Sequence, residues 1–356
     1  MGFFPWARAG WLALACSLCV HAAVTAAATP QPQRTDLITD MPAAGDLAAP
    51  ANGQTLYVLD EARGEVMAID PFDPAAKPWT AVSAGPRGDA GTDTLAIGCI
   101  DTSMLAMLCR SRDGWSLQTH RLQPGTAADP AKPAQTVVIG RANDAPAAAA
   151  TGAKSPEDDR ACLAISPSRD WLGVCGLPAP LPAVMRAPIA GARIGGVTAR
   201  ACPALPAGMR PTAATISMAE EFVLFATDRA GVQPAAGSVF VSFYLPPDPR
   251  RLLHLDTSLP RVHDAAFCRA DGTLWVVGGG PRGESGSAST AVAPEGLWRI
   301  DAVMRKGRQS AEAVCVARLE AARAVVCLSE RAIIVTHGRE TRTVSRIDPT
   351  QPASTP

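Results

Sequence analysis

Short apolar runs separated by turn residues recur along the whole chain. Two segments align without a gap, DLAAPANGQTLYV at 46–58 and DAAFCRADGTLWV at 264–276. In each, a short apolar run precedes an Asn-Gly or Asp-Gly pair, and an aromatic, β-branched run follows. Because such turn residues tolerate positive φ between two pleated runs, the pattern predicts β-hairpins.

The hairpin pattern can be placed six times along the chain. The second strands of these units begin near Leu56, Leu105, Leu172, Phe222, Leu274 and Ile333. A spacing of about 50 residues with three or four short strands per unit indicates a β-propeller, in which each blade is one four-stranded sheet. The longest interval contains the Ala/Pro-rich stretch 142–159, which predicts a surface loop. We therefore expect an all-β, six-bladed propeller.

The two ends of the chain are expected to meet in the last blade. Candidate outer strands of the first five units lie at 79–84, 135–140, 193–201, 251–259 and 311–319. The sixth unit ends after its third strand, TVSRIDP at 343–349, so its outer strand must come from elsewhere. Residues 35–41 (TDLITDM) can supply it, which would close the ring and leave no open sheet edge.

Residues 1–28 have the pattern of a signal peptide. Arg8 supplies a positive charge, 10–20 (GWLALACSLCV) is an apolar run too short to span a bilayer, and 26–28 (AAA) offers a cleavage site. We expect a secreted or periplasmic protein, with the propeller over 29–349 and a disordered tail over 350–356. A lipid anchor on one of the two cysteines of the signal-like segment is the alternative. No later stretch is long and apolar enough for a transmembrane helix.

Composition narrows the class of partner. The chain has 356 residues, of which 47% are hydrophobic, and its 33 basic residues balance 33 acidic residues to a formal net charge of zero. A nucleic-acid partner needs a surplus of positive charge, so we expect none. The hydrophobic content is that of a globular protein, and we expect a monomer.

The cysteines favour structural roles. No CxxC pair occurs in the sequence, so the patterns of a zinc knuckle, a thioredoxin-type site and c-type haem attachment are absent. Cys162 and Cys175 bracket the turn 166–170 almost symmetrically, which predicts that they face each other across a hairpin and form a disulfide. The alternative is a pair of buried thiols. Cys99 and Cys109 are about four residues out of register around their own turn, so we expect no bridge between them.

An arginine recurs at nearly the same offset after the second strand in five units. These residues are Arg63, Arg112, Arg229, Arg282 and Arg339. In a propeller, the loops from second to third strand share one face with the loops that enter the next blade. The arginines are therefore candidate binding residues for a small anionic ligand or an acidic protein surface. The alternative is repeat ancestry, with each arginine paired to a neighbouring carboxylate in a surface ion pair worth about 0–1 kcal/mol.

One unit of the chain carries a recognisable resemblance. The run GQTLYVLDEARGEVMAIDP at 53–71 resembles a YVTN/NHL-type propeller repeat, and the six-unit count also resembles regucalcin/gluconolactonase-like and strictosidine synthase-like propellers. Regucalcin-like enzymes hold a central metal with oxygen ligands from several blades, and the metal activates water for lactone opening. That resemblance makes Asp46, Asp264 and His263 candidate ligand-binding residues, because both aspartates occupy one repeat position at the mouth of an inner strand.

The chain departs from that family in its first blade. The E-G-P context of the family's first-blade glutamate is replaced by Gly45-Asp46-Leu47. The alternative for both aspartates is capping of backbone N–H groups at strand starts. We therefore expect a non-enzymatic binding platform for an extracytoplasmic protein or a small anionic ligand, without a cofactor. A metal-dependent lactonase-type hydrolase holding calcium or zinc is the alternative. Three or more oxygen ligands converging at the channel would favour the enzyme, and an apolar or arginine-lined mouth would favour the binder.

Overall fold

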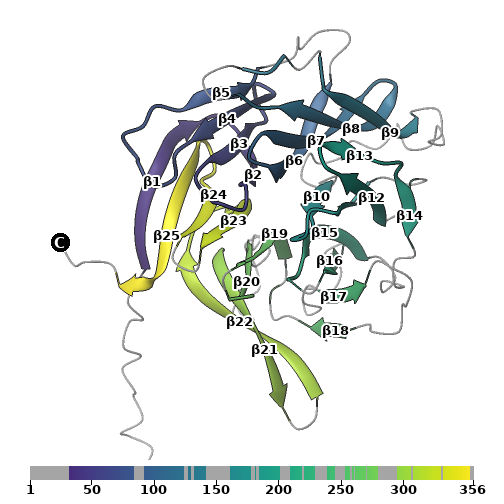
Figure 1. Ribbon diagram of the computed structural model, residues 1–356. Coiled ribbons are helices and arrows are strands. Elements are labelled where there is room, and N and C mark those ends of the chain that lie inside the picture. The colour runs from purple at the N-terminus through teal and green to yellow at the C-terminus, as the bar shows by residue number, and fades with distance from the viewer. Residues whose placement is uncertain are drawn as a thin grey trace, which may run out of the picture.

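The described strands form six antiparallel sheets arranged as the blades of a propeller (Figure 1). The computed structural model describes residues 32–83, 92–123, 127–129, 132–141, 161–177, 181, 184–200, 209–218, 220–228, 239–244, 253–256, 259, 261–269, 271–279, 295–305, 308–329 and 332–352. Within these ranges the regular elements are β-strands. No helix in this part of the chain has the length and apolarity needed to cross a bilayer.

Five blades are built from strands that are consecutive in sequence. The first contains β2 (Ala44–Ala48), β3 (Leu56–Asp60), β4 (Glu65–Ile69) and β5 (Trp79–Val82). The second contains β6 (Asp93–Asp101), β7 (Met104–Ser111), β8 (Gly114–Arg121) and β9 (Gln135–Arg141). The third contains β10 (Cys162–Ile165), β11 (Trp171–Cys175) and β12 (Val184–Ala190), with β13 (Arg193–Ile194) and β14 (Thr198–Arg200) both paired to β12. The fourth contains β15 (Met209–Ile216), β16 (Glu221–Asp228), β17 (Val239–Tyr244) and β18 (Leu253–Asp256), and the fifth contains β19 (Arg261–Phe267), β20 (Leu274–Gly279), β21 (Gly296–Arg305) and β22 (Arg308–Arg318).

The sixth blade joins the two ends of the chain. Its inner strands are β23 (Ala324–Ser329), β24 (Ala332–His337) and β25 (Arg342–Pro352), and β1 (Pro32–Met41) pairs antiparallel with β25 as the outermost strand. Figure 1 shows the purple β1 beside the yellow β25. The expected closure of the ring by residues 35–41 is therefore confirmed. β25 continues to Pro352, into the stretch that was expected to be a tail.

The predicted strand positions agree with the structure. The six second strands, β3, β7, β11, β16, β20 and β24, contain the residues at which they were expected to begin. The outer strand expected at 193–201 is split into β13 and β14, which are separated by Gly195 and Gly196. Glycine in a strand has no side chain to pack and weakens it, so a break at this pair is the physical reason for the difference.

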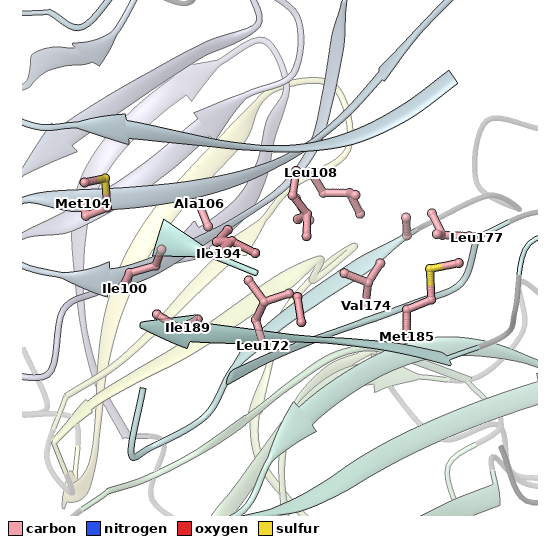
Figure 2. Close-up of a cluster of buried hydrophobic side chains, with 14 residues drawn as sticks. Ile100, Met104, Ala106, Leu108, Leu172, Val174, Leu177, Met185, Ile189 and Ile194 are labelled. Carbon is pink, nitrogen blue, oxygen red and sulfur yellow. The ribbon is translucent and has the colours of Figure 1, made fainter. Parts of the chain in front are cut away.

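The second strands are buried on both faces because each blade packs between two neighbours. All residues of β3, β11, β20 and β24 are buried. Figure 2 shows one interface, in which Met104 and Leu108 of β7 face Leu172 and Val174 of β11. Burying a side chain of this size contributes about 1.5–3 kcal/mol, so inter-blade packing is the main apolar contribution to stability.

A chain of hydrogen bonds, which runs from the exposed Asp36 to the buried Ser345 and His337, reinforces the closing strand. The hydroxyl of Ser345 donates to Oδ1 of Asp36 at 2.6 Å, and Nε2 of His337 lies 2.8 Å from the same hydroxyl. Since the serine proton goes to Asp36, His337 donates from Nε2. The three residues come from β1, β25 and β24, and Ser345 is fully buried. The network thus links the first strand of the chain to the last two.

We predict that removing the closing strand destabilises the protein. A chain beginning at Met41 loses the pairing of β1 with β25 and exposes apolar surface now covered by Leu37 and Ile38, at a cost of about 3 kcal/mol or more. Chemical denaturation compared with a chain beginning at Pro30 measures the loss. Ser345→Ala is the milder change, and it should cost about 1–3 kcal/mol because Asp36 and His337 lose their shared partner. Equal stability of the shortened and longer chains would contradict the closure.

The second prediction concerns pH. Burial, followed by the nearby positive charge of Arg34, lowers the pKa of His337 below its ordinary value of 6.5, while Asp36 opposes and Arg342 adds to this effect. Near pH 6.5 the histidine of the unfolded chain binds a proton, whereas His337 in the folded chain stays neutral. The free energy of unfolding is therefore highest above this pH and declines below it, by at most about 1.4 kcal/mol per pH unit. Unfolding free energies at pH 7.5 and 5.5, compared between the wild type and His337→Gln, isolate this residue from His120, which titrates in both proteins. An equal decline in both would refute the assignment.

Candidate functional site

The innermost strands of all six blades enclose a central channel. The channel contains a cavity of about 150 Å³, lined by residues of β2, β6, β10, β15, β19 and β23. Most of the lining residues have apolar side chains, and these include Leu163, Ile165, Ile216, Phe267, Val326 and Leu328. Polar atoms nevertheless make up the larger share of the exposed wall. Consecutive residues of each inner strand form the wall, because these strands are the innermost edges of their sheets.

Asp46 and Asp264 bring two carboxylates to the wall of this cavity. Asp46 lies inside a β-bulge of β2, and Asp264 follows directly after one in β19. A bulge disturbs the regular alternation and re-aims the neighbouring side chain. The structure therefore confirms that the two aspartates occupy equivalent places near the axis.

Each carboxylate joins its blade to the next one. Oδ2 of Asp46 accepts the backbone N–H of Ile97 on β6 at 2.8 Å, and Oδ1 accepts that of Leu47 at 2.9 Å. Oδ2 of Asp264 accepts the backbone N–H of Val325 on β23 at 2.8 Å. Hydrogen bonds to a charged group contribute about 1.5–3 kcal/mol. Both carboxylates therefore have a structural role and are held in a fixed orientation.

Other residues make the corresponding joins at other blade interfaces. Sγ of Cys162 on β10 donates to the carbonyl of Thr212 on β15 at 3.6 Å. The hydroxyl of Thr336 on β24 donates to the carbonyl of Gly45 on β2 at 3.5 Å and accepts the N–H of Ala324 at 3.0 Å. Polar links between neighbouring blades near the axis are thus a general feature of this ring.

His263 lies in the β19 bulge between Val262 and Asp264 and is half-buried. It does not belong to the cavity wall that contains both aspartates. In the described ranges, no group of three or more His, Cys, Asp or Glu side chains is close enough to hold a metal ion. Among the described residues, Asp46 and Asp264 are the only carboxylates on the cavity wall, and no third side chain of these four types joins them in a metal-binding group.

The cysteines on the cavity wall are protonated thiols. Cys99 and Cys327 both line the cavity. Burial raises the pKa of the Cys99 thiol far above its ordinary value of 9.0, and Arg169 opposes this shift. Burial likewise raises the pKa of Cys327. A nucleophilic cysteine needs a lowered pKa, so neither thiol is suited to that role.

The three predicted arginines that the structure describes do not belong to the cavity wall. Arg63, Arg112 and Arg339 occupy the turns that follow β3, β7 and β24, on one face as expected, whereas Arg229 and Arg282 lie outside the described residues. Nε of Arg63 is 3.8 Å from Oδ2 of the buried Asp60, and its side chain is 62% exposed. Nε of Arg339 is 2.5 Å from Oε1 of Glu320. These two pairs have the form that the solvated-turn alternative predicts, and the binding role of the five arginines stays a prediction.

Two other arginines were missed by the sequence analysis. Arg269 lines the cavity at its opposite end, in the turn between β19 and β20, and Arg169 lies in the turn between β10 and β11. Their positions in the two turns do not correspond, so no recurrence in the sequence marks them. The two arginines are related only in space, because their turns converge around the axis of the propeller.

Comparisons with known proteins support the fold. No family model and no curated protein matches the chain. A gluconolactonase from Xanthomonas campestris matches with a TM-score of 0.52 and 13% identity, over 89% of this chain and 89% of that one. The PQQ-bound form of an aldose sugar dehydrogenase from Streptomyces coelicolor matches with a TM-score of 0.51 and 13% identity, over 90% and 100%. A glucose dehydrogenase matches with a TM-score of 0.54 and 12% identity, over 88% and 99%.

Identities this low show a shared propeller fold and leave the activity open. The similar structures are mostly enzymes that their names connect with sugars or lactones.

The hairpin register of Cys162 and Cys175 is confirmed, since the two residues are direct partners in the pairing of β10 with β11. Both are thiols in the structure. Ser166 N–H donates to the carbonyl of Trp171 at 3.0 Å, so alternation along the hairpin places the cysteines at a hydrogen-bonded pair, where Cα atoms are about 5.5 Å apart. That Cα separation lies within the range of disulfides. The sequence, however, favoured a bridge at a non-hydrogen-bonded pair, where Cβ atoms are closer, so the bridge needs a local adjustment and stays a prediction. Cys99 pairs with Leu105, and Cys109 pairs with Thr94, so these two cysteines are out of register as expected.

We predict that Cys162 and Cys175 form a disulfide in oxidised protein. Such a bridge closes a short loop and should stabilise the fold by about 2–3 kcal/mol. Mass spectrometry of a non-reduced digest, after equilibration with oxidised and reduced glutathione, should give one cross-linked peptide containing both residues. Cys109 should be recovered alkylated and serves as the internal control. Recovery of Cys162 and Cys175 in separate alkylated peptides would exclude the bridge.

Proposed function

We propose that this propeller is an enzyme that acts on a small sugar derivative of the lactone class, and that the substrate enters the central channel. This is the alternative of the sequence analysis, and we place it before the non-enzymatic platform. Support comes from the fold similarity to a gluconolactonase and to sugar dehydrogenases, over 88% to 90% of the chain. The predicted signal peptide would place the activity outside the cytoplasm.

The observation that carries the proposal is the pair of carboxylates on the channel wall. Sugar hydroxyl groups are hydrogen-bond donors, and a carboxylate has about four acceptor positions. Asp46 directs two of these toward Leu47 and Ile97, which fixes the carboxylate against rotation. A fixed acceptor binds a donor at lower entropic cost than a mobile one.

Asp264 is the residue that we assign to the reacting end of the substrate. Lactone opening adds water to a carbonyl, and the water must lose a proton to a nearby base. Asp264 lines the cavity and shares β19 with Phe267, whose ring lines the same cavity and offers an apolar surface to the C–H face of a sugar ring. Acceptor and apolar surface therefore come from one strand. No metal-bound step is part of this proposal, because the described residues do not form a metal site.

A second candidate, the non-enzymatic binding platform, is favoured by one specific observation. The carboxylates of Asp46 and Asp264 bond to the next blades, and this structural role accounts for their common repeat position without any substrate. Under this candidate the channel or its faces bind a small anionic ligand or an extracytoplasmic protein and transform nothing.

We predict that Asp264→Asn abolishes lactone hydrolysis but preserves the fold. Asparagine keeps an acceptor oxygen for the N–H of Val325 and removes the charge that accepts the proton. Proton release from glucono-, galactono- and xylonolactone should fall about a hundredfold or more, as expected for loss of a general base. Asp73→Asn is the matched control, because Asp73 caps an exposed turn between β4 and β5 and should leave the rate unchanged.

The outcomes separate the two candidates. Turnover that survives Asp264→Asn would remove the assigned base. Lactones or aldonic acids that bind without turnover would leave the binding platform, and the absence of both binding and turnover would overturn a sugar-directed function. Elemental analysis of the same preparation is a further test, since bound calcium or zinc would restore the metal-dependent form of the alternative.

A further inference from the structure

The central cavity extends from the two aspartates toward the opposite face of the ring. That face carries the turns between the first and second strands, such as 49–55 and 166–170, and we refer to it as the inner-turn face. Ala51, Pro167, Met218 and Arg269 belong to the cavity wall at this end. Arg63, Arg112 and Arg339, by contrast, are on the face of the second-to-third-strand turns.

The turns of the inner-turn face converge around the axis. Gly53, in the turn after β2, has a φ of +64, and a Cβ placed on it would lie 3.5 Å from Cβ of Leu328 in the sixth blade. Side chains from these turns can therefore meet over the channel although they come from different blades. Arg169 and Arg269 belong to the turns of the third and fifth blades.

Arg269 lines the cavity, and Arg169 lies two residues after Pro167, which lines the same end of it. Burial, followed by repulsion from Arg169, lowers the pKa of the Arg269 guanidinium. Within the described ranges, neither guanidinium makes a hydrogen bond or an ion pair. Two like charges near one another over a partly apolar cavity destabilise the protein unless an anion lies between them.

The nearest carboxylate is already engaged by neutral donors. Glu220, in the turn of the fourth blade, partly offsets the repulsion at Arg269. Its Oε1 accepts the backbone N–H of Ser168 at 2.9 Å, and its Oε2 accepts the indole N–H of Trp171 at 2.8 Å. Both oxygens thus point toward the third blade and hold its turn, so Glu220 positions Arg169 and does not pair with it.

Two other described carboxylates of this face, those of Asp101 and Asp271, cap their own turns. Oδ1 of Asp101 accepts both the N–H and the hydroxyl of Ser103, and Oδ1 of Asp271 accepts the N–H of Thr273 at 2.9 Å. The exposed Asp170 also belongs to this face, in the turn that contains Arg169. These carboxylates reduce the positive potential over the channel, so the site is selective for a ligand that contacts both guanidinium groups directly and would not attract anions from a distance.

We propose that Arg169 and Arg269 bind the carboxylate of a small organic anion whose uncharged part enters the channel. The planar guanidinium fork matches a carboxylate in bidentate geometry. Beneath it, Phe267, Leu328 and the exposed Met218 offer apolar surface. The cavity of about 150 Å³ has the volume of an apolar cavity that accepts benzene, so the uncharged part is a single ring or a short branched chain. This site shares the cavity and Phe267 with the proposed lactone activity, but its two arginines are not used there, so it can be tested by binding alone.

Benzoate is a suitable probe, because it joins a carboxylate to one ring. Calorimetric titration should show binding that weakens with added salt. Arg269→Gln and Arg169→Asn should each weaken it about tenfold or more, the effect of losing a charge-assisted hydrogen bond. Asparagine is chosen at position 169 because it tolerates the positive φ of 64 found there. Arg269→Lys keeps the charge without the fork and should give an intermediate affinity.

The controls test separately the charge of the ligand, its aromatic ring and the place of the arginine in the protein. Benzyl alcohol lacks the charge and acetate lacks the ring, so both should bind more weakly than benzoate. Arg193→Gln removes an exposed arginine from the outer strand β13 and should leave benzoate affinity unchanged. If acetate bound as tightly as benzoate, the uncharged ring would not enter the channel. Equal affinities for benzoate in Arg269→Gln and Arg193→Gln, or no binding to the wild type, would overturn the site.

Discussion

No blade of this propeller can bury its own faces, so the stability of each depends on two neighbours and hence on the closure of the ring. The second strands are buried on both sides by adjacent blades, and an open ring would leave two of these faces in water. Closure depends on the pairing of β1 with β25, in which Asp36 is the direct partner of Ser345. A shift of one residue would turn Asp36 to the other face of the sheet, so their hydrogen bond favours a single register.

The same requirement explains the polar residues near the axis. Adjacent blades approach most closely there, and Asp46, Asp264 and Thr336 join strands that are distant in sequence through hydrogen bonds to the backbone. The two carboxylates of the channel therefore help to hold neighbouring blades together. A carboxylate held by backbone donors is also pre-oriented for a ligand, which means that structural and functional roles are carried by the same atoms. Substitution by asparagine separates them, because it keeps the acceptor and removes the charge.

Repetition made most of the fold predictable from the sequence. Turn residues between apolar runs located the six second strands, and the missing outer strand of the last unit located the closure. The split of the third blade's outer strand at Gly195 and Gly196 was not foreseen. The bond of Asp46 to Ile97 was not predictable either, since only the neighbouring backbone N–H at its own strand start could be read from sequence. Partners that are 51 residues apart depend on the angle between blades, which a strand pattern does not specify.

Recurrence along the sequence locates a face of the propeller but does not identify its function. The recurring arginines mark the turns after the second strands, and the described ones lie away from the cavity, two of them in ion pairs. Arg269 aligns with Ala51 in the gapless comparison of the two repeats, and thus breaks the pattern. Features that all repeats share are explained by common ancestry and by the packing of each blade against its neighbours. A side chain that departs from the repeat and lines the channel has neither explanation, so such departures are the better guide to what this propeller binds.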